Sequence, residues 1–373
     1  MKKLKKGICL ILTVLLCAGL FAACGNENEE PIQGELLGGR DSLAVVVEFE
    51  DSRPLLWEEF FFDLHRCRLI LESQGLAEDW DAIFEEQTFF PGEVTFNEFA
   101  ILYAMDTARE RRAVEALFNE LGETLEDNFY EDLRELVLTQ QEFDEESFQA
   151  FLAEHFVTEA VFRYINELPA MRERAMAALF GEEGELVPQE AIDAFIAEEG
   201  IVRAKHILLS TRDDQQQELP EEEVAAAAAL AEELYEELRT LSEEELFERF
   251  DEMVAEYGGD PGMRRDPTGY TFGPGVMVPE FTAGTQALEL FAFSEPIESF
   301  HGFHIILRMP VERDAVPMLA HGTGAHTIQA LVAWSQIEHA LAESKEGLVY
   351  ETTSLFDQII PSQVFANSVI DTE

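Results

Sequence analysis

Basic residues are scarce in this sequence. The 373 residues include 25 Lys and Arg against 76 Asp and Glu, so the formal net charge is -51 at pH 7. Proteins that bind nucleic acids use Lys and Arg to release counterions from the phosphates, whereas a chain this acidic would repel a phosphate backbone. The composition therefore excludes nucleic acid as a partner.

Long apolar runs are scarce as well. The clearest one extends from Ile8 to Ala23, about 16 residues, which is shorter than the roughly 20 that span a bilayer as a helix. Four lysines precede it within the first six residues, and small residues end it. These features predict a secretory signal peptide over residues 1–23 rather than a membrane-spanning anchor.

Cysteine is rare, and two of the four, Cys9 and Cys17, would leave with the signal peptide. The segment Leu20–Cys24 (LFAAC) resembles the lipobox of bacterial lipoproteins, where two small residues precede a cysteine that receives lipid and becomes the new N-terminus. That resemblance implies lipidation of Cys24. Cys67 then remains as the one thiol, which excludes an internal disulfide, and its place on an apolar helical stripe indicates a buried residue rather than a nucleophile.

Apolar surface, by contrast, is plentiful. Hydrophobic residues make up 47% of the chain and 29 residues are Phe, so the high charge does not imply disorder. At roughly 150 residues per domain the length predicts two or three cores. We expect a signal peptide over 1–23, a lipidated flexible tether over 24–40, a helical chaperone-like domain over 41–200, an α+β domain over 201–310 and a C-terminal helical extension over 311–373.

The region 41–200 has a helical pattern after one strand. The apolar run Leu43 to Phe49 predicts the strand, and Pro54 predicts the start of a helix. Apolar residues then recur at steps of three and four, so one helix face is expected to be buried: Leu56, Phe60, Leu64, Cys67 and Leu71. Residues 55 to 199 are therefore predicted to be almost wholly helical.

Two sequence pairs in this region have the pattern of a capping box. Thr95 is followed three residues later by Glu98, and Thr124 is followed by Asp127. In such a box the two side chains satisfy free backbone N–H groups at a helix start. Each pair therefore predicts the beginning of a further helix.

The pattern changes at residue 201. A strand is predicted over Ile201–Leu209, helices over Glu221–Arg239 and Ser242–Tyr257, a loop rich in Gly and Pro after them, and a strand over Phe303–Met309. Ser242 and Glu245 should cap the second helix. This order predicts a separate α+β domain. The tail, with a helix over about Thr327–Ser344, is too small to form a core alone and should pack back on the N-terminal helices.

Four blocks in the 201–310 region carry a family resemblance. They are Ala204–Leu209 (AKHILL), Met277–Phe281 (MVPEF), Ser294–Ile297 (SEPI) and Gly302–Ile306 (GFHII). In this order and spacing they resemble the parvulin, or rotamase, type of peptidyl-prolyl isomerase. The whole chain resembles foldase lipoproteins of the PrsA type, with a helical N-terminal domain, a parvulin α+β domain and a C-terminal helix that packs back.

The resemblance implies roles for six side chains of this domain. His206 and His304 match the two strand histidines beneath the bound peptide, and Asp260 matches their polar partner. Ser299 matches a hydroxyl that tunes the histidine pair, and two further residues match those that hold the proline ring, Met277 and Phe281. Rotation about an X-Pro bond makes and breaks no covalent bond, so the reaction requires no metal and no cofactor.

Each assignment has a structural alternative. His206 and His304 could form a hydrogen-bonded core pair, and Asp260 could be a turn carboxylate. Met277 and Phe281 would be apolar core in any fold. Histidines three residues apart, such as His301 and His304, point to opposite faces of a strand, which argues against a metal site there.

These observations predict a foldase anchored by lipid on the extracytoplasmic face of a Gram-positive cell membrane. Its partners would be unfolded or newly secreted polypeptides, whose X-Pro bonds it isomerises, and the sequence leaves a homodimer and a monomer both open. The main alternative is a non-catalytic holdase with a degenerate parvulin domain. A solute-binding lipoprotein would need two α/β lobes, which the helical N-terminal pattern does not support.

Overall fold

The structure is a computed structural model that describes residues 37–76, 79–84, 93–213, 215–320, 322 and 326–368. The predicted signal peptide and Cys24 therefore lie outside the described residues. The chain divides into two compact units, one joining residues 37–179 to 336–368 and the other comprising 180–335. We call them the terminal unit and the inserted unit. Across the described ranges, no helix is both long enough and apolar enough to cross a membrane.

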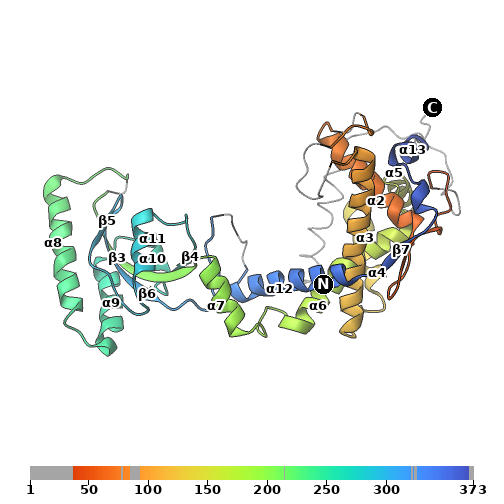
Figure 1. Ribbon diagram of the computed structural model, residues 1–373. Coiled ribbons are helices and arrows are strands. Elements are labelled where there is room, and N and C mark those ends of the chain that lie inside the picture. Colours follow the sequence, from red (N-terminus) through yellow and green to blue (C-terminus); the bar gives the residue numbers. More distant parts are fainter. Residues whose placement is uncertain are drawn as a thin grey trace. The chain divides into compact units, whose positions relative to one another are not determined.

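Helices dominate the terminal unit, as the sequence predicts. They are α2 (Trp57–Ser73), α3 (Phe96–Glu120), α4 (Phe129–Gln141), α5 (Glu145–Glu154) and α6 (Glu159–Phe180). The predicted apolar stripe of α2 is confirmed for Phe60, Leu64, Cys67 and Leu71, which are all buried. The fifth predicted member, Leu56, lies in a short strand before the helix and is only half-buried. Figure 1 shows α2 beside α3, and these two helices make the most extensive helix–helix contact of the unit.

One of the two predicted capping boxes in this unit is confirmed. Thr95 accepts from the N–H of Glu98, and the Glu98 carboxylate accepts from the N–H of Thr95, so α3 begins where predicted. The prediction for Thr124 and Asp127 is wrong. Residue Asn128 caps α4 instead, without a side-chain bond to the backbone, because residues 123–126 form no helix and α4 starts only at Phe129.

A three-stranded antiparallel sheet in the terminal unit joins the N-terminal part of the chain to the C-terminal part. Its order is β2 (Leu55–Leu56), β1 (Val45–Phe49) and β7 (Tyr350–Thr352). Pro54 does not open α2 as predicted, because the next two residues pair with β1 as a short strand and the helix begins only at Trp57.

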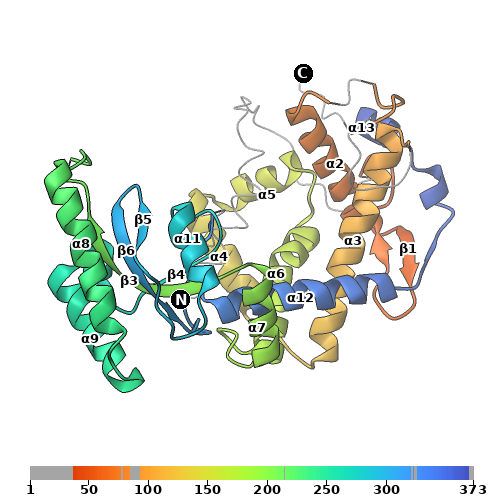
Figure 2. The same ribbon diagram turned by 60° about the vertical axis from the view of Figure 1, so that its left-hand side comes forward.

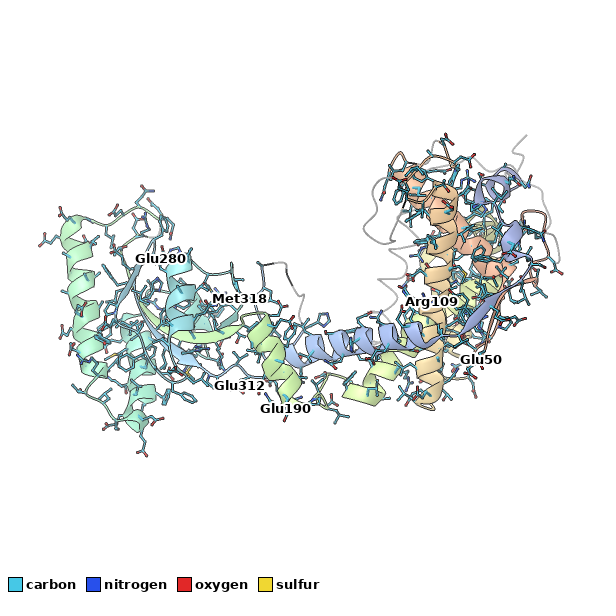
Figure 3. All side chains as sticks on the ribbon, viewed as in Figure 1. Glu50, Arg109, Glu190, Glu280, Glu312 and Met318 are labelled. Carbon is cyan, nitrogen blue, oxygen red and sulfur yellow. The ribbon has the colours of Figure 1, made fainter. Side chains whose placement is uncertain are left out.

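The C-terminal segment packs back on the terminal unit, as predicted. It contains α12 (Ile328–Gly347), β7, the short 3₁₀ helix η1 (Phe356–Gln358) and α13 (Pro361–Ala366). Val364 and Phe365 belong to the same buried cluster as Trp57 and Phe60. Arg109 of α3, labelled in Figure 3, donates to the backbone carbonyl of Lys345 near the end of α12 at 2.9 Å.

The terminal unit also buries complete ion pairs. Arg111 of α3 makes a two-pronged pair with Asp63 of α2, with 2.8 Å between Nη1 and Oδ1, and both side chains are buried. Arg112, fully buried, bonds Glu59 at 3.2 Å and the Tyr164 hydroxyl at 2.8 Å. These pairs connect α2, α3 and α6.

One buried histidine of this unit is surrounded by rings. His65 of α2 stacks on Phe156 with a centroid distance of 4.0 Å and an angle of 14°, and its Nε2 has no hydrogen-bond partner. Burial, and secondarily the charge of Arg68, lowers the pKa of His65 to about 3. Its imidazole is therefore neutral at physiological pH.

The inserted unit is built on a four-stranded antiparallel sheet in the order β4-β3-β6-β5. The strands are β3 (Val202–Ser210), β4 (Tyr270–Phe272), β5 (Ile297–Ser299) and β6 (Gly302–Met309). The helices are α7 (Gln189–Glu198), α8 (Glu221–Leu238), α9 (Glu243–Tyr257), α10 (Pro261–Arg265) and α11 (Pro279–Ala287). Ser242 and Glu245 form the predicted capping box of α9. The unit extends beyond the predicted 201–310 region at both ends, because it includes α7 and the start of α12.

The two faces of this sheet carry different clusters, because side chains alternate along a strand. Ile207, Leu209, Ile305 and Leu307 pack with α8 and α9 on one face. Ala204 and Ile306 pack with Phe281 of α11 on the other. Figures 1 and 2 both show α8 and α9 together on one side of the sheet and α11 on the opposite side.

A segment after β6 extends the sheet at its β4 edge. Met318, labelled in Figure 3, forms a parallel bridge with Phe272. Its N–H donates to the carbonyl of Thr271, and its carbonyl accepts from Gly273, both at 2.9 Å. The edge of β4 is thereby covered within the inserted unit.

Candidate active site

Two histidines lie side by side on the α11 face of the inserted unit. His206 of β3 pairs with Ile306, and His304 of β6 pairs with Leu208, so the antiparallel register puts both histidines on one face at diagonal positions. Their Nδ1 atoms are 2.9 Å apart and their rings are nearly parallel, with an angle of 12°. Both are buried, at 5% and 3% exposure.

Asp260 joins this pair from the loop after α9. It is the N-cap of α10, where Oδ1 accepts from the N–H of Gly262 at 2.8 Å. Oδ2 lies 2.9 Å from Nε2 of His206 and accepts the Tyr270 hydroxyl at 2.6 Å. Burial acts to raise the pKa of Asp260, but the hydrogen bonds from His206, Tyr270 and Gly262 outweigh it and hold that pKa well below the usual range.

Ser299 contacts the histidine pair on the His304 side, opposite Asp260. It lies on β5, next to β6, and its Oγ is 2.7 Å from Nε2 of His304. The same oxygen accepts from the backbone N–H of His301 at 3.1 Å, which fixes the hydroxyl over the turn. The histidine pair is thus held at both ends.

The direction of the hydrogen bonds follows from the charge of Asp260. An ionised carboxylate only accepts, so His206 donates from Nε2, and in the neutral imidazole its Nδ1 then accepts. His304 therefore donates from Nδ1, and its Nε2 accepts the proton of Ser299. Burial, with added repulsion from His206 and His301, lowers the pKa of His304 to about 3, which agrees with a neutral ring. Each hydrogen bond of the site is thus donated in the same direction, from Ser299 toward Asp260.

Phe281 forms the apolar wall of the site. It follows Glu280, labelled in Figure 3, in the first turn of α11. Its ring meets His206 at a centroid distance of 4.9 Å and His304 at 5.4 Å, both edge to face. Met277, just before α11, is half-buried and packs against the same cluster.

Comparison with known families matches this region. The family described as "Rotamase: PPIC-type PPIASE domain" matches residues 206–309, which contain every polar member of the site. The chain contains a parvulin-type domain. The predicted resemblance and the mixed fold class of a helical region with a parvulin domain are thereby confirmed.

Two relatives each match part of the chain. It is 30% identical over 189 residues to the foldase protein PrsA of Oceanobacillus iheyensis, covering 49% of this chain and 54% of the relative. It is 43% identical over 60 residues to PrsA of Halalkalibacterium halodurans, covering 16% of this chain and 18% of the relative. The crystal structure of PrsA from Bacillus subtilis covers 72% of this chain and 91% of its own at 15% identity, with a TM-score of 0.23. The chain thus spans about half the length of the first relative, and far less of the second.

The parvulin-type domain brings six predicted side chains together: His206, His304, Asp260, Ser299, Met277 and Phe281. Their roles in the reaction remain predictions. Cys24, the predicted lipid site, lies outside the described residues. Within the described ranges, no group of three or more His, Cys, Asp or Glu side chains could hold a metal ion.

Tyr270 is the member of the site that the sequence analysis missed. It lies in β4 and bonds Asp260 through its hydroxyl. A tyrosine two residues before the buried Phe272 is unremarkable as a sequence pattern, because alternation alone places it only on the same face of the strand. What identifies Tyr270 is the short distance between β4 and the N-cap of α10. That distance is known only once the fold is known.

Proposed function

We propose that this chain is an extracytoplasmic foldase, anchored by lipid at Cys24, that binds newly secreted polypeptides and catalyses cis-trans isomerisation of their X-Pro bonds. The observation that carries the proposal is the buried pair His206 and His304, held between Asp260 and Ser299 against the ring of Phe281. The relatives named foldase protein PrsA support the same role.

The site has the two properties that the reaction needs. Rotation of an X-Pro bond faces a barrier of about 18–20 kcal/mol, because the amide loses its resonance when it twists. Phe281 and Met277 offer an apolar surface for the proline ring. The hydrogen-bonded histidine pair offers fixed dipoles that need no reorganisation when the amide twists. The chemistry thus consists of holding a twisted conformation more tightly than a planar one.

The acidic surface adds a preference for clients. With 76 acidic against 25 basic residues, the chain attracts polypeptides with basic segments at long range. Salt screens such attraction over a Debye length of about 8 Å at physiological ionic strength. The proposal therefore includes faster client capture at low salt than at high salt.

A second candidate is a holdase that binds unfolded chains without isomerising them. It is favoured by the low exposure of Phe281, His206 and His304, because a proline ring needs access to this face of the sheet. In this candidate the histidine chain is a polar element of the core. The chaperone role of residues 41–200 would then be the whole activity.

An isomerisation assay on a short X-Pro peptide separates the two. We expect the wild type to accelerate the reaction and His304→Ala to lose about tenfold or more in kcat/KM, since about 1.4 kcal/mol of transition-state stabilisation is tenfold in rate. His339→Ala is the matched control, because this exposed histidine of α12 is not a member of the site. A wild type no faster than the uncatalysed reaction, together with protection of an aggregating client, would favour the holdase.

The lipid anchor is tested separately. Cys24→Ser should abolish incorporation of labelled fatty acid, because serine cannot form the thioether. One acyl chain gives only marginal membrane binding, so two or more chains on Cys24 are expected in the wild type. Labelling of the serine variant at the wild-type level would refute the lipoprotein assignment.

A further inference from the structure

The Asp260 carboxylate is engaged on both oxygens. Oδ1 accepts from the backbone N–H of Gly262 at 2.8 Å, while Oδ2 is shared between His206 Nε2 at 2.9 Å and the Tyr270 hydroxyl at 2.6 Å. The bond from Tyr270 is the shortest of the three. A hydroxyl on a carboxylate is a charge-assisted bond and is stronger than a neutral one. Tyr270 therefore contributes strongly to where this carboxylate points.

The backbone around Tyr270 is built for that contact. Tyr270 pairs with Ala204 on β3, so its side chain shares a face with Ala204 and His206. The residue before it, Gly269, has φ +101°, and a Cβ there would lie 2.8 Å from the carbonyl oxygen of Ala204. This glycine lets β4 approach β3 where Tyr270 begins the strand.

Gly262 makes room for the hydroxyl. A Cβ at this position would lie 1.9 Å from the Tyr270 hydroxyl oxygen and 3.1 Å from its Cζ. Gly262 belongs to the helix α10, so its backbone conformation does not itself call for glycine. The absence of a side chain at 262 is therefore explained by the reach of Tyr270 to Asp260.

We propose that Tyr270 is a positioning residue of the site: its phenol holds the Asp260 carboxylate in the orientation that accepts from His206, and so keeps the hydrogen bonds aligned through to Ser299. The catalytic part of this proposal rests on the proposed isomerase function. The structural part does not, because it concerns the tautomers of His206 and His304 in the protein alone.

The first test compares Tyr270→Phe with Tyr257→Phe in the full chain. Tyr257 of α9 also bonds a carboxylate, that of Glu256, but lies outside the site. We expect Tyr270→Phe to lower kcat/KM about three- to tenfold. Tyr257→Phe should leave kcat/KM unchanged.

A second test removes the hydroxyl contact without touching Tyr270. Gly262→Ala should displace the phenol and reproduce the kinetic defect of Tyr270→Phe. In the double variant Gly262→Ala/Tyr270→Phe the closest clash is gone, so the two effects should not add. Fully additive losses would show that Gly262 acts independently of Tyr270 and would contradict the positioning role.

Nitrogen-15 NMR of the histidine rings makes the proposal independent of turnover. The wild type should show His206 protonated at Nε2 and His304 at Nδ1, and Tyr270→Phe should shift or broaden these signals while Tyr257→Phe leaves them. If the wild type lacks isomerase activity, the proposed function fails and the NMR result alone decides the role of Tyr270. Unchanged histidine signals in Tyr270→Phe would overturn the proposal.

Discussion

The two units bury polar groups in opposite ways. The terminal unit buries full charges in pairs, Arg111 with Asp63 and Arg112 with Glu59. The inserted unit buries two hydrogen-bonded imidazoles between a half-buried carboxylate and a hydroxyl. Loss of one partner from a buried ion pair leaves an uncompensated charge. The hydrogen bonds of the imidazole pair can instead change partners within the chain. The first network suits a scaffold, and the second suits a site whose hydrogen bonds can rearrange.

The largest expected effect is a loss of stability in the terminal unit. Arg111→Leu leaves Asp63 buried without its partner, and loss of one member of such a pair costs about 3–5 kcal/mol. The free energy of unfolding can be measured by urea titration with tryptophan fluorescence, since Trp57 is buried in this unit.

Two further variants serve as controls for Arg111. Arg111→Leu/Asp63→Leu should recover most of the loss, because an apolar pair replaces the charges. Arg163→Leu removes a more exposed pair with Glu167 on α6 and should cost about 1 kcal/mol or less. If Arg111→Leu were no worse than Arg163→Leu, the buried pair would not be a scaffold element.

A smaller effect separates function from packing in the inserted unit. Phe281→Leu keeps most of the apolar volume, so we expect a stability loss of only about 1–2 kcal/mol. If the ring holds the proline, isomerisation should still fall about tenfold or more, measured on the same short peptide.

The matched control for Phe281 is a buried ring of the terminal unit. Phe148 is fully buried and meets Phe162 edge to face at 5.4 Å. Phe148→Leu should lose similar stability and leave the isomerase rate unchanged. Equal and parallel losses of stability and rate in both variants would return Phe281 to a core role.

The third expected effect is a loss of stability in acid. Because the pKa of His65 is lowered to about 3 in the fold and histidine ordinarily titrates near 6.5, the unfolded chain binds a proton between these pH values that the native state does not. Its contribution to stability is therefore complete above about pH 6.5 and is lost as the pH falls, by about 1.4 kcal/mol per pH unit. His65→Phe should flatten this loss between pH 5 and 7 in thermal unfolding.

An exposed histidine provides the comparison for His65. His339 lies on the surface of α12 beside Glu343. His339→Gln should leave the pH dependence of stability as in the wild type. A His65→Phe variant with the wild-type slope would show that the buried ring does not govern acid sensitivity of the terminal unit.

Local sequence patterns predict many helices and strands correctly. They fail where contacts with residues distant in the sequence decide where an element begins. Thr95 with Glu98 caps α3 as predicted, because both partners lie within one helical turn. Pro54 was a wrong helix start, since its neighbours pair with β1 in a sheet that the local sequence does not reveal. Thr124 with Asp127 has the pattern of a box, but the helix starts later, at Phe129.

The residues of the candidate site also divide into those that the sequence predicts and one that it does not. His206 and His304 were predictable from the sequence blocks around them, and strand alternation explains why they share a face with Ile306. Tyr270 was not predictable, because its role depends on the missing side chain of Gly262 and on the approach of β4 to the start of α10. Sequence identifies groups that carry chemistry, whereas the groups that orient them are chosen by three-dimensional proximity.

The pairing of β1 with β7 imposes an order of assembly. Thr353 bonds the carbonyl of Val45 across 308 positions of the chain, and the inserted unit lies entirely between these partners. As the polypeptide emerges N-terminus first, β1 must wait for its partner until nearly the last residues arrive, while residues 180–335 are already available to fold. We expect the parvulin-type domain to fold first, before β1 has paired with β7 in the terminal unit.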